Sequence, residues 1–357
     1  MPSFFPIKVK DVYKETEDCS VITLHIPEDL KSDFQYHQGQ HLTLKKDING
    51  EDVRRSYSLC SSPVDDEWKV AVKQIYEGKF STFVNRELKA NDILEVMPPS
   101  GDFGVDVQQD TDQTYLFFAA GSGITPILSM IKTHLAKEPY SNCKLFYLNK
   151  NAKSIIFKEE IEQIRNRYFG RFEIFYFLTR EQRDIELLNG RFTSKKIQAL
   201  SNSVFDIDDV SDVFVCGPEQ MIFMIRDELT RLGLEADRIH FELFVSGLSE
   251  EDKKRTDAAL AKRKDGTQIT ILDGGKEFHF AMTKAYDNIL DAALAAGADL
   301  PFACKGGVCS TCKCRVMEGH VEMKVNYALE KNEVAQNLVL SCQAVPTTDK
   351  VTVDFDV

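Results

Sequence analysis

The stretch Cys304-Lys-Gly-Gly-Val-Cys-Ser-Thr-Cys-Lys-Cys314 places four cysteines within eleven residues of a 357-residue chain. Cys304, Cys309 and Cys312 follow the spacing C-x4-C-x2-C, and Cys342 is the last cysteine of the chain. This spacing is typical of plant-type [2Fe–2S] clusters, which are held by four thiolates. The sequence therefore predicts Cys304, Cys309, Cys312 and Cys342 as metal ligands.

Disulfides and zinc are the two other uses of such cysteines. Nine cysteines is an odd number, and the start MPSFFPIKVKD lacks a charged leader followed by an apolar segment. We therefore expect a cytoplasmic protein, in a compartment where disulfides are rare. Zinc usually prefers two C-x2-C pairs, and Cys309 with Cys312 forms the single such pair here, so a zinc site is the second hypothesis.

The residues around the cysteines indicate a small α+β domain. Glycine, serine and threonine between the cysteines suit a loop that aims backbone N–H groups at the sulfurs. Cys314 starts the alternating run KCRVMEGHVEM, which predicts a strand and a packing role for this cysteine. ITILDGGKEFHFAM predicts a hairpin, NILDAALAAG a helix and VTVDFDV a final strand. Residues 267–357 thus resemble a β-grasp ferredoxin domain.

A one-electron cluster needs a donor, and residues 54–59, RRSYSL, offer a flavin site. An arginine can pair with phosphate, an aromatic ring can lie on a flavin, and a hydroxyl can reach the ring's edge. YHQGQHLTL and KVAVKQI alternate like barrel strands, and EGKFSTFV predicts a helix start that could cradle a pyrophosphate. An ordinary strand and a capped turn would look similar.

The next segment, TYLFFAAGSGITPILSMIKTHL, predicts a strand, a glycine turn and a helix, an order that lets a backbone approach a dinucleotide. Pro126 stands where the usual fingerprint has its third glycine. Strand and helix patterns then alternate up to VSDVFVCGPEQMIFMIRDELTRLG, which indicates a parallel sheet. Cys216-Gly217-Pro218 lies at one strand end, where ligands of such sheets bind.

The net charge and the lengths of the apolar stretches exclude two classes of partner. The formal net charge is −12, whereas a nucleic-acid-binding face must be basic. No apolar stretch approaches the ~18 residues of a membrane span. We therefore expect neither a nucleic acid nor a membrane as partner.

The motifs R-x-Y-S, G-x-x-S, G-x-G-I-T-P and C-G-P, in this order, resemble the ferredoxin–NADP reductase superfamily, here with a C-terminal plant-type ferredoxin domain. Within this superfamily, the chain most resembles the reductases of phenylacetyl-CoA epoxidase systems. The stretch that carries most of this likeness is DLPFACKGGVCSTCKCRVMEGHVEMKVNYALEKNEVAQNLVLSCQA. The resemblance implies a multidomain chain. It has an antiparallel β-barrel that binds FAD over 1–108, an α/β nucleotide domain over 109–245, a linker over 246–266 and the ferredoxin domain over 267–357.

The resemblance also implies roles for residues. Arg55 would hold FAD phosphates, Tyr57 and Ser58 would contact the isoalloxazine, and Cys216 would lie beside the nicotinamide; the last three are the candidate catalytic residues. The full set expected to bind FAD or the nicotinamide cofactor is Arg55, Ser56, Tyr57, Ser58, Lys73, Gly78, Lys79, Phe80, Ser81, Thr82, Gly121, Gly123, Thr125, Pro126, Cys216, Gly217 and Pro218.

The implied function is an NAD(P)H-dependent oxidoreductase that passes electrons through FAD and the cluster to an oxygenase, with phenylacetyl-CoA epoxidase as the first expectation. A Rieske or other ring-hydroxylating oxygenase is an alternative acceptor, and a redox-sensing protein without enzymatic activity is a further one. FMN is an alternative to FAD. Lys150, Lys153 and Arg180 favour NADPH over NADH. The charged segment 246–266 is either a mobile tether or a docked spacer.

Overall fold

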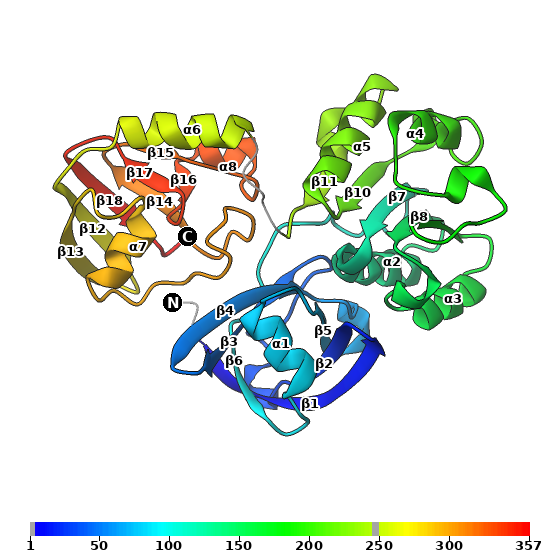
Figure 1. Ribbon diagram of the computed structural model, residues 1–357, viewed down its shortest axis with the longest axis horizontal. Helices are drawn as coiled ribbons and strands as arrows, with labels where there is room; N and C mark the ends of the chain where they lie inside the picture. Colours follow the sequence, from blue (N-terminus) through cyan, green and yellow to red (C-terminus); the bar gives the residue numbers. More distant parts are fainter. Residues whose placement is uncertain (1–3, 245–249) are drawn as a thin grey trace. The chain divides into compact units, whose positions relative to one another are not determined.

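The computed structural model describes residues 4–244 and 250–357. The chain forms two compact units, Phe4–Leu243 and a second one that contains Phe244–Val357 (Figure 1). The boundary predicted between residues 245 and 246 lies outside the described residues. Each unit is described by itself.

The first unit begins with an antiparallel sheet in the order β4-β3-β6-β1-β2-β5. Its edges meet, because an isolated bridge joins Leu59 to Val70 and the Cys60 N–H donates to the Lys69 carbonyl at 2.9 Å. The sheet is thus the predicted β-barrel, and helix α1 packs against it. The strands and helix are β1 (Phe5–Thr16), β2 (Cys19–His25), β3 (His41–Ile48), β4 (Glu51–Ser58), β5 (Trp68–Lys73), α1 (Lys79–Arg86) and β6 (Ile93–Val96).

The remainder of this unit is an α/β layer with a parallel sheet in the order β11-β10-β7-β8-β9, flanked by helices on both sides (Figure 1). The predicted alternation of strands and helices is confirmed. Its elements are β7 (Thr114–Ala120), α2 (Ile124–Lys137), β8 (Asn142–Asn149), α3 (Lys158–Arg167), β9 (Phe172–Leu178), α4 (Ser194–Ser201), β10 (Asp212–Cys216), α5 (Glu219–Arg231) and β11 (Ile239–Glu242).

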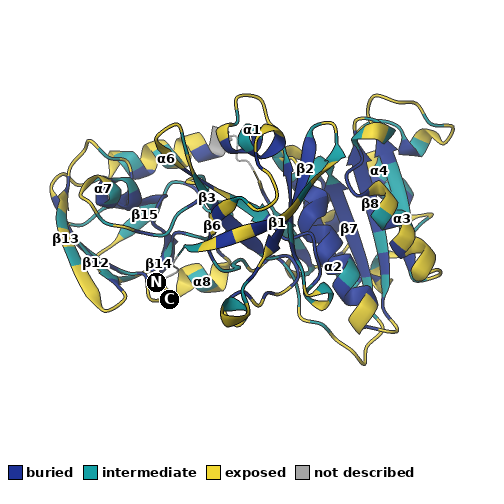
Figure 2. Cartoon of the chain, turned by 90° about the horizontal axis from the view of Figure 1, so that it is seen from below, coloured by how far each residue is buried: buried dark blue, intermediate teal, exposed yellow. Residues whose placement is uncertain are grey.

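Aromatic pairs in register hold the middle of this parallel sheet. Phe117 lies opposite Phe214 with ring centroids 5.2 Å apart, and on the other face Phe118 stacks on Phe146 at 4.6 Å. Successive side chains of a strand point to opposite faces, so both faces are apolar and both need helices to cover them. Figure 2 shows β7 and α2 in the colour of buried residues.

The second unit contains a mixed five-stranded sheet in the order β13-β12-β18-β14-β16, with β12 and β18 parallel. The predicted hairpin turns at Gly274 and Gly275, whose φ angles are +58° and +72°, a conformation that favours glycine. The elements from this point are β12 (Thr267–Asp273), β13 (Lys276–Met282), α7 (Ile289–Ala295), β14 (Lys313–Glu318), β15 (Val321–Met323), α8 (Lys331–Ala335), β16 (Leu338–Leu340), β17 (Ala344–Pro346) and β18 (Lys350–Asp354).

Part of the predicted linker is a helix in this second unit. α6 (Glu250–Ala261) contacts β15, and Lys262 pairs with Glu322 of β15 at 2.6 Å. None of the helices within residues 4–244 and 250–357 is long and apolar enough to cross a membrane.

A buried carboxylate joins α2 to the strand beside it. Glu138 has no exposed surface, and its carboxylate accepts hydrogen bonds from His134 Nδ1 at 2.8 Å, the Gln108 N–H at 2.8 Å and the Tyr115 hydroxyl at 3.3 Å. Burial raises the pKa of Glu138, but the hydrogen bonds from His134 and Gln108 outweigh it and hold the pKa below its ordinary 4.5. The ionised form therefore stabilises the folded unit.

We expect Glu138→Gln to lower the free energy of unfolding by about 2–4 kcal/mol at pH 7, because a buried hydrogen-bonded charge is lost. The folded-state pKa is depressed, so this contribution is present above the unfolded pKa and is lost as pH falls through the folded pKa. Urea unfolding at pH 7 and at pH 4 measures both effects. The exposed Glu87→Gln is the control, and equal losses for the two variants would contradict this role for Glu138.

Candidate functional site

The R-x-Y-S residues form the end of barrel strand β4. Arg55 is exposed, and the Ser58 side chain is buried where the strand ends. The Tyr57 ring packs at 5.7 Å on Phe80, a buried residue of α1. Ser56 is hydrogen-bonded to Thr43 at 3.1 Å. The tyrosine ring is thus supported from behind, and an exposed guanidinium lies two residues before it.

Helix α1 begins directly after Gly78, and no side chain caps it at that residue. A Cβ at Gly78 would lie 2.4 Å from Ser81 Oγ and 2.4 Å from Ile75 Cγ1, so this tight turn needs glycine. Ser81 Oγ accepts the Ile75 N–H at 3.2 Å, Thr82 accepts from the Gln74 amide at 3.4 Å, and Lys79 pairs with Glu51. An uncapped helix start near an exposed arginine fits the phosphates of FAD.

Two tight turns lie against each other in the nucleotide layer. The turn Gly121–Gly123 follows β7, and a Cβ at Gly123 would lie 2.2 Å from the Cys216 carbonyl oxygen. A Cβ at Gly217 would lie 2.9 Å from the Ala120 side chain. Both positions therefore exclude any side chain, which brings the end of β10 against the β7–α2 turn.

The predicted residues that follow Gly123 open helix α2. Thr125 is buried, and its hydroxyl donates to the Ser122 carbonyl at 3.0 Å. Pro126 comes next in the first turn of the helix, where a missing N–H costs nothing. Pro218, by contrast, is the N-cap residue directly before α5. The two helix starts thus flank the two glycine turns.

Ser58 of the barrel meets the carboxyl edge of the parallel sheet. Its hydroxyl donates to the Glu242 carboxylate at 3.0 Å, and Glu242 lies opposite Cys216 in the pairing of β11 with β10. The Cys216 thiol is buried, and burial raises its pKa well above the usual value, with the Glu242 charge adding to the effect. A barrel residue and a nucleotide-side residue predicted separately are therefore joined through Glu242.

Glu242 was missed in the sequence. Its one signal is a carboxylate at the end of the short strand in RIHFELF, the position at which parallel sheets present ligand-binding groups. Lys73, by contrast, belongs to the set that the family resemblance implies. Its ammonium lies 3.6 Å from Asp18 and would be 3.9 Å from a Cβ at Gly121, which puts a cation beside the first glycine turn.

In the second unit, the four predicted ligands lie as two pairs. The side chain of Cys304 interacts with that of Cys309, and the side chain of Cys312 interacts with that of Cys342. Cys304 is half-buried, and the other three are buried. Cys314 points into the core of this unit, with a pKa raised by burial. Two thiolate pairs fit a two-iron cluster, with one pair for each iron.

Backbone N–H groups point at these sulfurs. The Cys309 thiol and the N–H groups of Val308 and Gly306 lower the pKa of Cys304 to about 7 against the effect of burial, and the Gly306 N lies 3.3 Å from its sulfur. The loop turns at Lys305, Gly307 and Ser310, which all have positive φ. Within the described residues no group of three His, Cys, Asp or Glu side chains could hold a single metal ion. The arrangement thus suits a cluster whose sulfurs receive hydrogen bonds.

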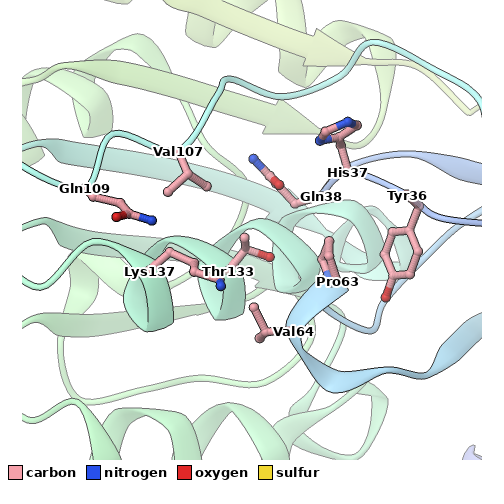
Figure 3. Close-up of a pocket in the computed structure, with 9 residues that line it drawn as sticks. All are labelled: Tyr36, His37, Gln38, Pro63, Val64, Val107, Gln109, Thr133 and Lys137. Atoms are coloured by element: carbon pink, nitrogen blue, oxygen red, sulfur yellow. The ribbon is translucent and has the colours of Figure 1, made fainter.

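A hollow of about 220 Å³ lies apart from these residues in the first unit (Figure 3). Thr133 and Lys137 of α2 line one side of it, and barrel loops line the rest. Its lining is Tyr36, His37, Gln38, Pro63, Val64, Val107, Gln109, Thr133 and Lys137. None of the predicted site residues belongs to it.

Three family models match the chain in the predicted order. An oxidoreductase FAD-binding domain covers residues 6–104, an oxidoreductase NAD-binding domain 117–227, and a 2Fe-2S iron-sulfur cluster binding domain 272–347. These matches confirm FAD and a [2Fe–2S] cluster as cofactors and do not favour the zinc and FMN alternatives.

Curated relatives match over the whole length. The chain is 39% identical to one component of the 1,2-phenylacetyl-CoA epoxidase of Escherichia coli (strain K12), covering 100% of this chain and 99% of that protein. It is 32% identical to the "3-ketosteroid-9-alpha-monooxygenase, ferredoxin reductase component" of Rhodococcus rhodochrous, covering 98% and 96%.

Solved structures share the fold. Phthalate dioxygenase reductase, described as a modular structure for electron transfer from pyridine nucleotides to [2Fe–2S], matches with a TM-score of 0.58 at 21% identity over 99% of this chain and 98% of its own. An intact type IV self-sufficient cytochrome P450 monooxygenase matches with a TM-score of 0.71 at 23% identity, over 98% of this chain and 41% of its own. The chain belongs to the ferredoxin–NADP reductase superfamily, in the family of oxygenase reductase components that combine a flavin domain, a nicotinamide domain and a [2Fe–2S] domain.

Proposed function

We propose that this chain is the reductase component of a phenylacetyl-CoA epoxidase and that it takes its electrons from NADPH. The observation that carries the proposal is the full-length likeness to a component of the Escherichia coli epoxidase, together with all four cluster cysteines and the joined barrel and nucleotide residues. The likeness to the steroid monooxygenase reductase supports a second candidate, the reductase of another ring-hydroxylating oxygenase.

The proposal divides the work among the predicted segments. Residues 1–108 would hold FAD, 109–245 the nicotinamide cofactor and 267–357 the cluster. We also propose a reducing, cytoplasmic compartment, in which cysteines outside the ligand set stay as thiols. When bound, FAD accepts two electrons as a hydride and releases them one at a time, whereas the cluster carries one.

The chain's own residues would position these partners. Arg55 and the start of α1 would bind FAD phosphates, and Tyr57, backed by Phe80, would support the flavin ring. Ser58 would present its hydroxyl with the orientation that the Glu242 carboxylate gives it. Cys216 would offer a thiol that stays protonated, because burial raises its pKa. This arrangement would place the nicotinamide across the flavin from the barrel.

NADPH is favoured by cations at the ends of β8 and β9. The Arg180 N–H donates to the Lys150 carbonyl at 2.8 Å, so the two residues are neighbours where the strands end. The side chains of Lys150, Lys153 and Arg180 are exposed and make no hydrogen bond or ion pair with another described residue. The nearby Glu181 carboxylate accepts the Ala152 N–H at 2.8 Å. Three uncommitted cations beside one committed carboxylate favour a 2′-phosphate.

The order of electron transfer is tested with purified phenylacetyl-CoA epoxidase components and phenylacetyl-CoA. The wild-type chain should support substrate-dependent NADPH oxidation. Cys309→Ser should abolish this activity and cytochrome reduction, because a ligand is lost, while direct NADPH-to-ferricyanide activity through FAD remains. Cys314→Ala, which removes a core thiol outside the two ligand pairs, should retain two irons per chain. Loss of both activities in Cys309→Ser would overturn the order.

The role of the serine–carboxylate pair is tested in the flavin half-reaction. Ser58→Ala and Glu242→Gln should each lower the rate of flavin reduction by NADPH by about 10- to 100-fold, because the hydroxyl loses its place or its partner. The double variant should be little worse than either single one, since the two residues act as a unit. Ser203→Ala, which changes an exposed serine, should match wild type. An unchanged rate in Ser58→Ala would remove this residue from the site.

Coenzyme preference is tested by steady-state kinetics with NADPH and NADH. Arg180→Ala should raise the KM for NADPH by about 10-fold or more, through loss of a charged hydrogen bond, and leave the KM for NADH unchanged. Arg86→Ala, an exposed arginine on α1, is the control. A wild-type chain that prefers NADH, or equal changes for both coenzymes in Arg180→Ala, would contradict the assignment.

A further inference from the structure

Helix α6 packs on the cluster-binding unit along one stripe of its surface. Asp252 and Ala259 are buried, and Thr256, Leu260 and Arg263 are half-buried. These positions recur at the spacing of one helix face. The stripe buries little apolar area. Its Asp252 carboxylate is hydrogen-bonded, whereas the buried Thr256 hydroxyl has no hydrogen-bond partner among the described residues, and Arg263 follows the helix, which ends at Ala261.

The carboxylate of that stripe is held by a tyrosine. Asp252 is 4% exposed, and its Oδ2 accepts the Tyr327 hydroxyl at 2.5 Å. Burying a carboxylate is costly unless hydrogen bonds replace its water. The contact therefore fixes the start of α6 to the segment that contains Tyr327.

Tyr327 is in turn bonded to the cysteine loop. Its backbone N–H donates to the Gly307 carbonyl at 3.0 Å. A Cβ at Gly307 would lie 3.2 Å from Cγ of Gln343, whose side-chain amide donates to the Cys342 sulfur at 3.5 Å. Gly307 has a φ of +77°, and a Cβ there would lie 3.2 Å from the Val325 carbonyl oxygen. The tyrosine segment therefore holds the Gly307 carbonyl in the cysteine loop, and Gln343, which packs against Gly307, donates to the Cys342 sulfur.

We propose that α6 is a positioning element of the iron–sulfur site, which acts through Asp252, Tyr327 and Gly307 on the Cys342 sulfur. Two hydrogen bonds run from the helix through Tyr327 to Gly307, and Gln343 beside Gly307 donates to the Cys342 sulfur. N–H bonds to cluster sulfurs and the residues that orient them set how firmly the metal is held and at what potential it is reduced. The inference rests on the proposed cluster and its ligands.

The alternative is that α6 only packs on this unit along its whole length and has no effect on the iron–sulfur site. Its other anchor separates the two roles, because Lys262 pairs with Glu322 at 2.6 Å and lies outside the path to Cys342. Loss of that pair would loosen the helix without altering Tyr327. A positioning role predicts that only the Asp252 end affects the cluster.

The test uses the full-length holoprotein and measures iron release to a chelator, the visible circular dichroism of the cluster and its midpoint potential. Tyr327→Phe removes one hydroxyl and keeps the backbone N–H. It should speed iron release by roughly 10-fold, the usual effect of losing an outer partner of a metal ligand, and alter the dichroism and the potential. Asp252→Ala should do the same, and the double variant should be no worse than either alone.

Three comparisons keep the outcomes distinct. Asp252→Asn, which retains an acceptor for the tyrosine, should largely restore the wild-type values, and it serves if Asp252→Ala does not fold. Lys262→Ala should leave iron release unchanged. Wild-type iron release, dichroism and potential in a folded Tyr327→Phe, or an equal effect of Lys262→Ala, would overturn the proposal. A wild-type chain that binds no iron would instead refute the proposed function.

Discussion

The absence of a side chain at Gly123 decides how the nucleotide side of the site is built. A Cβ there would lie 2.2 Å from the Cys216 carbonyl oxygen, so the β7–α2 turn can lie against the end of β10 only with glycine at this position. That contact places Cys216 and its strand partner Glu242 at one edge of the sheet. Ser58 can then reach Glu242 from the barrel. The joining of two sequence motifs into one site thus depends on a steric constraint at one residue.

The two redox sites of this chain have opposite surroundings, as their chemistry requires. The residues predicted to bind FAD include an exposed arginine and an uncapped helix start, groups that suit a large anionic cofactor. The predicted cluster ligands are mostly buried, and the Gly306 N–H lies 3.3 Å from the Cys304 sulfur. Burial limits access of water to a low-potential centre, and N–H groups compensate the charge of its thiolates.

Local patterns predicted the architecture well, because each element carries its own signal. The cysteine spacing, the Gly274–Gly275 hairpin and the alternation around β7 to β10 depend on residues within a few positions of one another. Glu242 could not be linked to Ser58 in this way, since their contact spans the barrel and the sheet. Only the fold brings such distant residues together. A single polar contact between two distant segments therefore could not be predicted from the sequence.

The packing of the segment from 250 to 263 also could not be predicted from local sequence patterns. Its charged composition predicts a spacer because hydrophobic periodicity is the usual signal of a docked helix, and α6 lacks large apolar residues along most of its buried stripe. A helix can also be fixed by a carboxylate, provided that a partner replaces its water. Tyr327 supplies that partner from far along the chain. A buried charge on a polar helix is costly for stability, and the proposed positioning role would give that cost a functional reason.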